Sequence, residues 1–103
     1  MSAVRHRDHP VADVASIVDA DTQCVDVREP DEVAGGTIDG FVNIPLGALG
    51  DRVGELAPDR RVVLLCRSGN RSTTAAKYLT ANGFTDVVNL AGGMLAYDQG
   101  GLS

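Results

Sequence analysis

Four apolar residues in succession, Val62 to Leu65, constrain most strongly what this chain can fold into. A half-buried strand alternates apolar and polar residues, whereas an unbroken β-branched and leucine run is typical of a strand covered on both faces. Such strands belong to parallel sheets, because crossover connections place helices over the sheet. The run therefore predicts the central strand of a parallel sheet.

Helical and strand patterns alternate along the rest of the chain. Helical signals mark Pro10 to Ala20, Glu29 to Glu32, Leu46 to Leu56, Ser72 to Asn82 and Met94 to Tyr97. Strand patterns mark Cys24 to Arg28, Phe41 to Ile44, Val62 to Leu65 and Asp86 to Leu90. This order predicts one α/β domain over residues 1–103, with a central, mainly parallel sheet flanked by helices on both faces. Residues 1–9 are predicted to be a short or frayed N-terminal segment.

Composition excludes several classes of function. With 103 residues, 44% of them hydrophobic, the chain can bury a core of its own. A formal net charge of -5 argues against binding to nucleic acid or to an anionic membrane. No apolar run is long enough to span a bilayer, and the first ten residues lack the apolar region of a signal peptide. We therefore expect a cytoplasmic protein whose two cysteines are free thiols.

The residues after the apolar run, CRSGNRS at 66–72, have the composition of an anion-binding turn. The chain leaves a strand at Cys66, turns at Gly69 and begins a helix, so several unpaired backbone N–H groups can converge on one point. Arg67 and Arg71 add positive charge. A free thiol has a pKa of about 8.5 and is only a few per cent ionised at pH 7. The helix dipole and the two arginines would lower the pKa of Cys66, so that the thiolate becomes the major form and Cys66 a nucleophile at neutral pH.

The alternative for Cys66 is a small buried hydrophobe that closes a strand, the common fate of a free cysteine. Its arginine, glycine and serine neighbours at a strand-to-helix turn favour the chemical interpretation.

Four separated blocks of the sequence carry a further signal, namely Val25 to Pro30, Ile38 to Pro45, Cys66 to Ser72 and Leu90 to Met94. In this order they resemble the single-domain rhodaneses, a family of thiosulfate sulfurtransferases. The likeness extends from about Val14 to Gly101.

The resemblance implies ping-pong sulfur transfer. The Cys66 thiolate would take a sulfane sulfur from thiosulfate or a similar donor and pass it from a persulfide to cyanide, a thiol or a sulfur-accepting protein, such as a thioredoxin-like one. The family's loop residues carry over as substrate-binding groups, namely Arg67, Ser68, Gly69, Asn70 and Arg71. No cofactor or metal is expected, since the sequence has no nucleotide, flavin or metal motif.

Two other functions stay open. Related folds that hydrolyse phosphate esters or reduce arsenate carry five residues between the cysteine and the arginine, whereas four lie between Cys66 and Arg71 here. The second is a partner-dependent persulfide carrier or a non-catalytic binding module on the same fold, because fold does not determine function.

Asp26 and Arg28 are predicted supporting residues, at the carboxyl end of the strand Cys24 to Arg28, which should neighbour the strand before Cys66. We expect Asp26 to orient a loop arginine and Arg28 to hold the segment before the next strand. Glu29 is predicted to be a helix-start acid.

The remaining candidates are assigned to structure. Cys24 opens its strand, about four residues from the carboxyl end where Cys66 should lie, which is too far for a disulfide, so it is predicted to be a core residue. His6 and His9 are assigned neither a metal nor catalysis. The sequence departs from the family pattern at three positions, Thr37, Phe41 and Tyr97. Thr37 and Phe41 lie in the segment that leads to Pro45, so the preference for a sulfur donor stays open.

Overall fold

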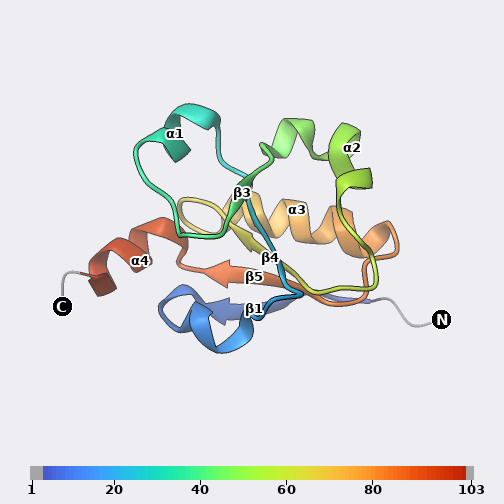
Figure 1. Cartoon of the computed structure of the whole chain (residues 1–103), viewed down its shortest axis with the longest axis horizontal. Coiled ribbons are helices and arrows are strands. Elements are labelled where there is room, and N and C mark those ends of the chain that lie inside the picture. Colours follow the sequence, from blue (N-terminus) through green and yellow to red (C-terminus); the bar gives the residue numbers. More distant parts are fainter. Residues whose placement is uncertain (1–3, 102–103) are drawn as a thin grey trace.

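The computed structural model describes residues 4–101, with side chains described through residue 98. In this range five strands form one sheet in the order β1-β5-β4-β2-β3, and every neighbouring pair is parallel (Figure 1). The strands are β1 Arg7–Pro10, β2 Gln23–Asp26, β3 Val42–Asn43, β4 Val62–Leu65 and β5 Val87–Ala91. The predicted α/β fold is confirmed, with β4, the unbroken apolar run, as the central strand.

Within the described part of the chain, four α-helices connect or follow these strands. They are α1 Pro30–Ala34, α2 Leu49–Arg52, α3 Asn70–Ala81 and α4 Gly93–Gly101. In α1, Pro30 occupies the first turn and Glu29 and Glu32 form a capping box, which satisfies backbone N–H groups at the helix start. The helix predicted from Leu46 to Leu56 is instead α2 between two short 3₁₀ turns, because its three glycines weaken a continuous helix.

The N-terminal region corrects two predictions. Arg7–Pro10 is not frayed but forms β1, the edge strand that pairs with β5. The predicted helix from Pro10 to Ala20 is a 3₁₀ helix at Val11–Ile17 that buries Val11 and Val14. An edge strand can have polar side chains and end in proline, so its sequence carries little strand signal. Residues 1–3 of the predicted frayed segment lie outside the described residues.

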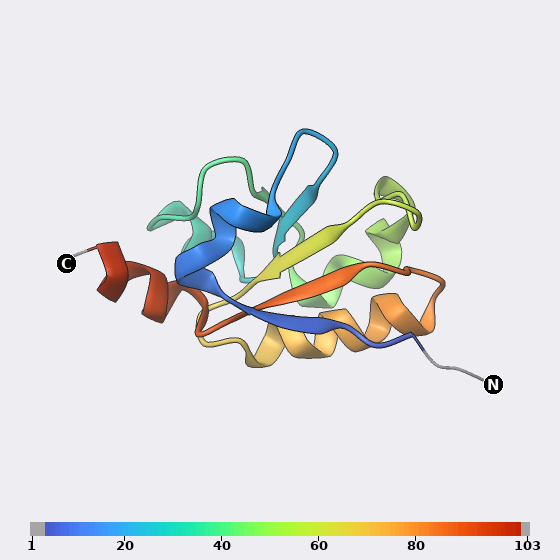
Figure 2. The same cartoon turned by 90° about the horizontal axis from the view of Figure 1, so that it is seen from below.

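Two hydrophobic clusters cover the two faces of the sheet. Figure 2 shows α3 and the 3₁₀ helix Val11–Ile17 on opposite sides of the strands. One cluster packs α2 and α3 against alternate strand residues such as Val25, Val62 and Leu64, and it includes Cys66. The other packs the 3₁₀ helix and α4 against the intervening residues, Cys24, Val63 and Leu65 among them. Within residues 4–101, no helix is long and apolar enough to cross a lipid bilayer.

Candidate active site

Cys66 lies at the carboxyl end of the central strand, directly after Leu65. Its residue is only 1% exposed. The backbone N–H of Gly69 donates to Sγ at 3.0 Å, and the Ser72 hydroxyl oxygen lies 3.2 Å from Sγ. The carboxyl edge of a parallel sheet is where such folds bind ligands, so the thiol has the position of a reacting group.

Gly69 makes this geometry possible. It is the N-cap of α3 with φ of 103°, in the left-handed region that favours glycine. The chain reverses there and begins α3 at Asn70, so the positive end of the helix lies beside the sulfur. The serine, glycine and asparagine after Cys66 therefore build a turn whose N–H groups converge on an anion.

The pKa of Cys66 is lowered from the ordinary value of a thiol. Burial is the largest influence and raises the pKa, but hydrogen bonds from the Ser72 side chain and from the amides of Ser72, Gly69 and Ser68 together lower it further. Donors aimed at the sulfur favour its ionised form. The site therefore stabilises a thiolate despite excluding water from it.

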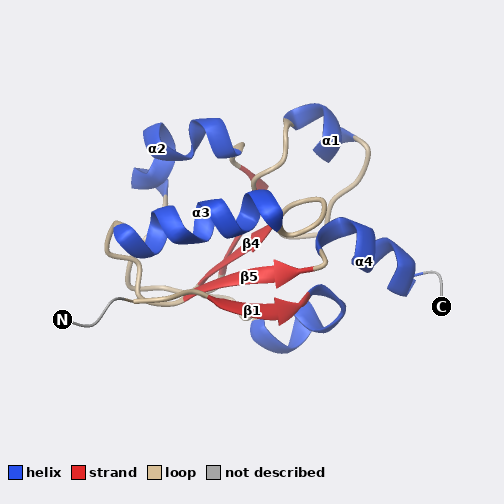
Figure 3. Ribbon diagram, turned by 180° about the vertical axis from the view of Figure 1, so that it is seen from behind, coloured by secondary structure: helices blue, strands red, loops and turns tan. Residues whose placement is uncertain are grey.

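The start of α4 holds the loop from the other side (Figure 3). The N–H of Met94 donates to the Cys66 carbonyl at 2.9 Å, and the N–H of Leu95 donates to the Arg67 carbonyl at 3.0 Å. Gly93 has φ of 56°, and a Cβ at this position would overlap the carbonyl oxygens of Cys66 and Arg67. Gly93 thus has to be glycine for the helix to approach this closely.

The two loop arginines have different environments. Arg71 makes a two-pronged ion pair with Glu32 of α1, with N–O distances of 2.7 and 2.8 Å. The hydrogen bond from Arg71 lowers the pKa of Glu32 to about 2. Arg67 is exposed and, among residues with described side chains, has no ion-pair partner. Arg67 is therefore the cation available to an incoming anion, with the exposed Ser68 and Asn70 beside it.

A buried polar network lies beneath the loop, and sequence reasoning missed it. The Ser72 hydroxyl donates to Oδ1 of Asn89 on β5, and both residues are almost fully buried. The amide Nδ2 of Asn89 donates to Asp8 of β1 at 3.0 Å and to Oγ1 of Thr73 at 3.1 Å. The available signal was an asparagine inside an otherwise apolar strand, since buried polar groups require partners.

Comparison with known proteins agrees with this geometry. The Rhodanese-like domain family matches residues 11–99, most of the chain. The chain belongs to this family. A protein named Sulfurtransferase from Allochromatium vinosum is 42% identical over 82 residues, which cover 80% of this chain and 77% of that protein. The thiosulfate sulfurtransferase GlpE of Shewanella oneidensis is 38% identical over 77 residues, covering 75% and 76%.

Solved structures show the same fold. A rhodanese-related protein from Thermoplasma volcanium superposes with a TM-score of 0.82 at 30% identity, covering 92% of this chain and 93% of that one. A similar unit occurs within a NAD-dependent persulfide reductase from A. fulgidus, with a TM-score of 0.68 at 26% identity, covering 91% of this chain but 16% of that one. Rhodanese-like domains therefore occur both alone and as parts of larger sulfur enzymes.

The predicted role of Asp26 in this rhodanese-like domain needs a correction. Asp26 is fully buried and pairs with Arg28, with Nη2 to Oδ2 at 2.7 Å, and not with a loop arginine. Thr37 donates its hydroxyl to the same Oδ2 at 2.7 Å, and Arg28 also donates to the Gly36 carbonyl at 2.7 Å. Asp26 and Arg28, two residues apart on β2 and the segment after it, neutralise each other's charge, and Glu32 pairs with the loop residue Arg71 instead.

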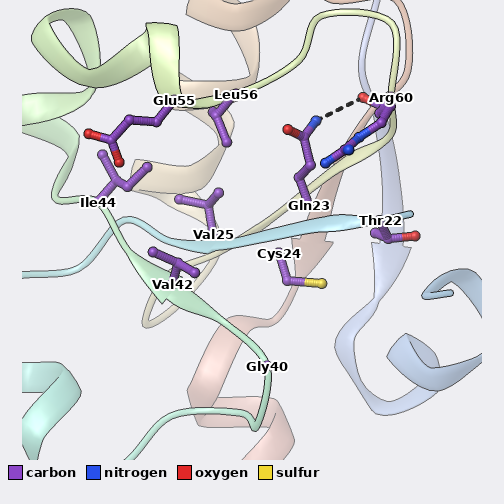
Figure 4. Close-up of a pocket in the computed structure, with 10 residues that line it drawn as sticks. All are labelled: Thr22, Gln23, Cys24, Val25, Gly40, Val42, Ile44, Glu55, Leu56 and Arg60. Carbon is purple, nitrogen blue, oxygen red and sulfur yellow. Dashed lines mark hydrogen bonds between the residues drawn. The ribbon is translucent and has the colours of Figure 1, made fainter. Parts of the chain in front are cut away.

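A surface hollow at β2 lies away from Cys66. Its volume is about 300 Å³, and its lining includes Gln23, Cys24 and Val42 but not Cys66. Figure 4 shows the Gln23 amide bonded to the Arg60 carbonyl, with the Cys24 sulfur on the other side of β2. Burial raises the pKa of Cys24, which packs in the cluster on the α4 face. A buried thiol with a raised pKa is an inert core residue, as predicted from its place in the strand.

The remaining singled-out residues lie apart from the thiol. His9 Nε2 is 3.2 Å from Asp13 in the N-terminal region, and His6 Nε2 is 3.5 Å from Asp8. Phe41 packs against the cluster on the α4 face, and Tyr97 is 37% exposed. Of the three departures from the family pattern, only Thr37 enters the network of Asp26 and Arg28.

Proposed function

We propose that this protein is a sulfurtransferase that moves a sulfane sulfur from thiosulfate, or a similar donor, to cyanide or a thiol through a persulfide on Cys66. The observation that carries the proposal is the buried sulfur at the carboxyl end of β4, with the Gly69 N–H 3.0 Å from it and a lowered pKa. The relatives named as sulfurtransferases support the same reaction class.

The chemistry needs no redox partner. In the first step the Cys66 thiolate attacks the outer sulfur of thiosulfate, a sulfur–sulfur bond forms, and the bond to the sulfonate sulfur breaks with its electron pair leaving on sulfite. In the second step cyanide attacks the terminal sulfur of the persulfide anion, and thiocyanate leaves as Cys66 regains its thiolate. Both steps conserve charge, so fixed donors suffice to stabilise the anions.

The loop supplies those donors. Arg67 attracts the dianionic donor, and Gly69 holds the reacting sulfur through its backbone N–H. Ser68 and Asn70 line the mouth of the loop with polar side chains and amides. Arg71 adds charge while its pair with Glu32 holds the loop against α1. Asp26 and Arg28 support the segment that leads to β3.

Intact-mass measurement after incubation with thiosulfate tests the proposal. The wild type should gain one sulfur atom, about 32 Da, and lose it on addition of cyanide or a thiol, as expected for a nucleophilic cysteine. Cys66→Ser should gain nothing, whereas Cys24→Ser should load like the wild type. A missing gain in the wild type, or an equal gain in Cys66→Ser, would overturn the proposed reaction.

A partner-dependent persulfide carrier is the second candidate. The occurrence of this fold inside a persulfide reductase favours it. It predicts that the persulfide forms but that cyanide and small thiols remove it slowly, while a sulfur-accepting protein removes it quickly. Comparing the rate of sulfur loss to cyanide with the rate to thioredoxin separates the two. A cytoplasmic location stays a prediction, in keeping with two free cysteines.

A further inference from the structure

The hydroxyl proton of Ser72, at the base of the active-site loop, has two possible acceptors. The Ser72 oxygen lies 3.2 Å from Cys66 Sγ and also donates to Asn89 Oδ1. A serine hydroxyl carries one proton, so it can donate to only one of these groups at a time. The structure records Asn89 as the acceptor.

The orientation of the Asn89 amide decides this choice. Its Nδ2 donates to Oδ1 of Asp8 and to Oγ1 of Thr73, and Thr73 donates in turn to the Gly69 carbonyl at 2.7 Å. Both amide hydrogens are therefore used. Turning the amide over would place its oxygen against the Asp8 carboxylate, two acceptors facing each other, so Oδ1 is held toward Ser72.

We propose that Asn89 is a positioning residue that competes with Cys66 for the Ser72 proton, and that the Ser72 hydroxyl changes acceptor during each catalytic cycle. With a neutral thiol, the Cys66 S–H donates to Ser72 and Ser72 donates to Asn89. When the thiolate forms, the hydroxyl turns to Sγ and leaves Asn89 Oδ1 without that bond. In the persulfide the charge moves to the outer sulfur, and the hydroxyl returns to Asn89.

The competition of Asn89 for the Ser72 proton opposes the effect of the positive charges around the sulfur. Arg67 flanks Cys66 on the chain, and Arg71 faces it from the first turn of α3 while paired with Glu32 of α1. On the opposite side, Asp8 of β1 holds the asparagine and has His6 3.5 Å from its carboxylate. The arginines favour the thiolate and Asn89 opposes it. Asn89 thus limits how strongly the resting thiolate is stabilised, so the sulfur stays nucleophilic.

The inference rests on the proposed function for the identity of the reacting thiolate, but its test needs no sulfur donor. The rate of Cys66 alkylation by iodoacetamide is measured across pH, with the site followed by peptide mass mapping. Asn89→Ala should shift the half-maximal rate to lower pH and raise the rate at pH 6.5 about threefold, because one competing hydrogen bond is lost. Asn89→Asp should shift it to higher pH.

The Ser72→Ala background separates positioning from folding. There the shared proton is gone, so Asn89→Ala should produce no further downward shift. Asp8→Ala, at an exposed side chain, releases the amide without removing it and should shift the profile downward less than Asn89→Ala does. A merely structural asparagine would instead loosen the loop and move the profile to higher pH, and that result, or an unchanged shift in the Ser72→Ala background, overturns the inference. Failure of thiosulfate loading with these shifts intact would count against the proposed function alone.

Discussion

The two cysteines of this chain have the same side chain and similar burial, yet their pKa values move in opposite directions. Cys24 is 8% exposed and Cys66 1% exposed. Burial is the largest influence on both and raises both pKa values. At Cys24 nothing offsets it, whereas at Cys66 hydrogen bonds from the loop reverse the direction.

The difference lies in where each residue stands on its strand. Cys24 is inside β2, beside Val63 of β4, so backbone N–H groups near it are committed to the sheet. Cys66 is one residue past the end of β4, where the chain turns and α3 begins with N–H groups that lack intrahelical partners. The lowered pKa of Cys66 therefore follows from its place between the end of a strand and the start of a helix, not from exposure of the sulfur.

Competitive alkylation gives the largest contrast. At pH 7 iodoacetamide should modify Cys66 more than about tenfold faster than Cys24, because the thiolate is the nucleophile. Exposure alone predicts the reverse order. The Cys66 rate should rise with pH and level off below the usual thiol pKa of about 8.5, since its pKa is lowered.

Denaturant provides the control for that contrast. Unfolding removes both environments, so the two cysteines should then react at similar rates. Equal rates in the folded protein, or a faster Cys24, would show that the loop donors do not outweigh the burial of Cys66.

A methyl group at Gly93 should bring Cys66 closer to the behaviour of Cys24. Gly93→Ala places a Cβ against two loop carbonyls at a positive φ, so the loop or α4 must move. We expect a loss of about 2 kcal/mol or more in the free energy of unfolding, from strain and overlap together. Alkylation of Cys66 at pH 7 should slow, because the loop amides no longer point at the sulfur and its pKa rises.

Gly83→Ala is the matched control. Gly83 also has a positive φ, 92°, but nothing lies within 4 Å of its added Cβ, at the far end of α3. It should cost about 1 kcal/mol in urea unfolding and leave Cys66 alkylation unchanged. If both variants slow alkylation equally, α4 does not hold the loop.

The sequence predicts those parts of the site whose signal is local. The apolar run before Cys66 and the glycine after it predicted the central strand, the turn and the sulfur's position. The contacts of Glu32 with Arg71 and of Asn89 with Ser72 were beyond such reasoning, because each comes from an element distant in sequence. Asp8 of β1 contacts Asn89 and is also distant from the loop in sequence. β1 was missed for a related reason, since a polar edge strand carries no apolar alternation.

The smallest expected effect concerns the pair of Arg71 with Glu32, which the environment of Cys24 lacks. The pKa of Glu32 falls from 4.5 to about 2 in the folded protein, so the pair stabilises fully above pH 4.5 and loses that contribution as pH falls toward 2. Both partners are partly exposed, so Glu32→Gln should cost no more than about 1 kcal/mol at pH 7. Urea unfolding from pH 7 to pH 3 should show the stability difference between Glu32→Gln and the wild type shrinking as the pH falls.

Glu55→Gln is the control, because it breaks the exposed pair with Arg52 far from the loop. It should leave the Cys66 alkylation profile unchanged, whereas Glu32→Gln should alter it. A constant stability difference down to pH 3, or an unaltered profile in Glu32→Gln, would mean that Arg71 is fixed by other contacts and that the loop does not depend on α1.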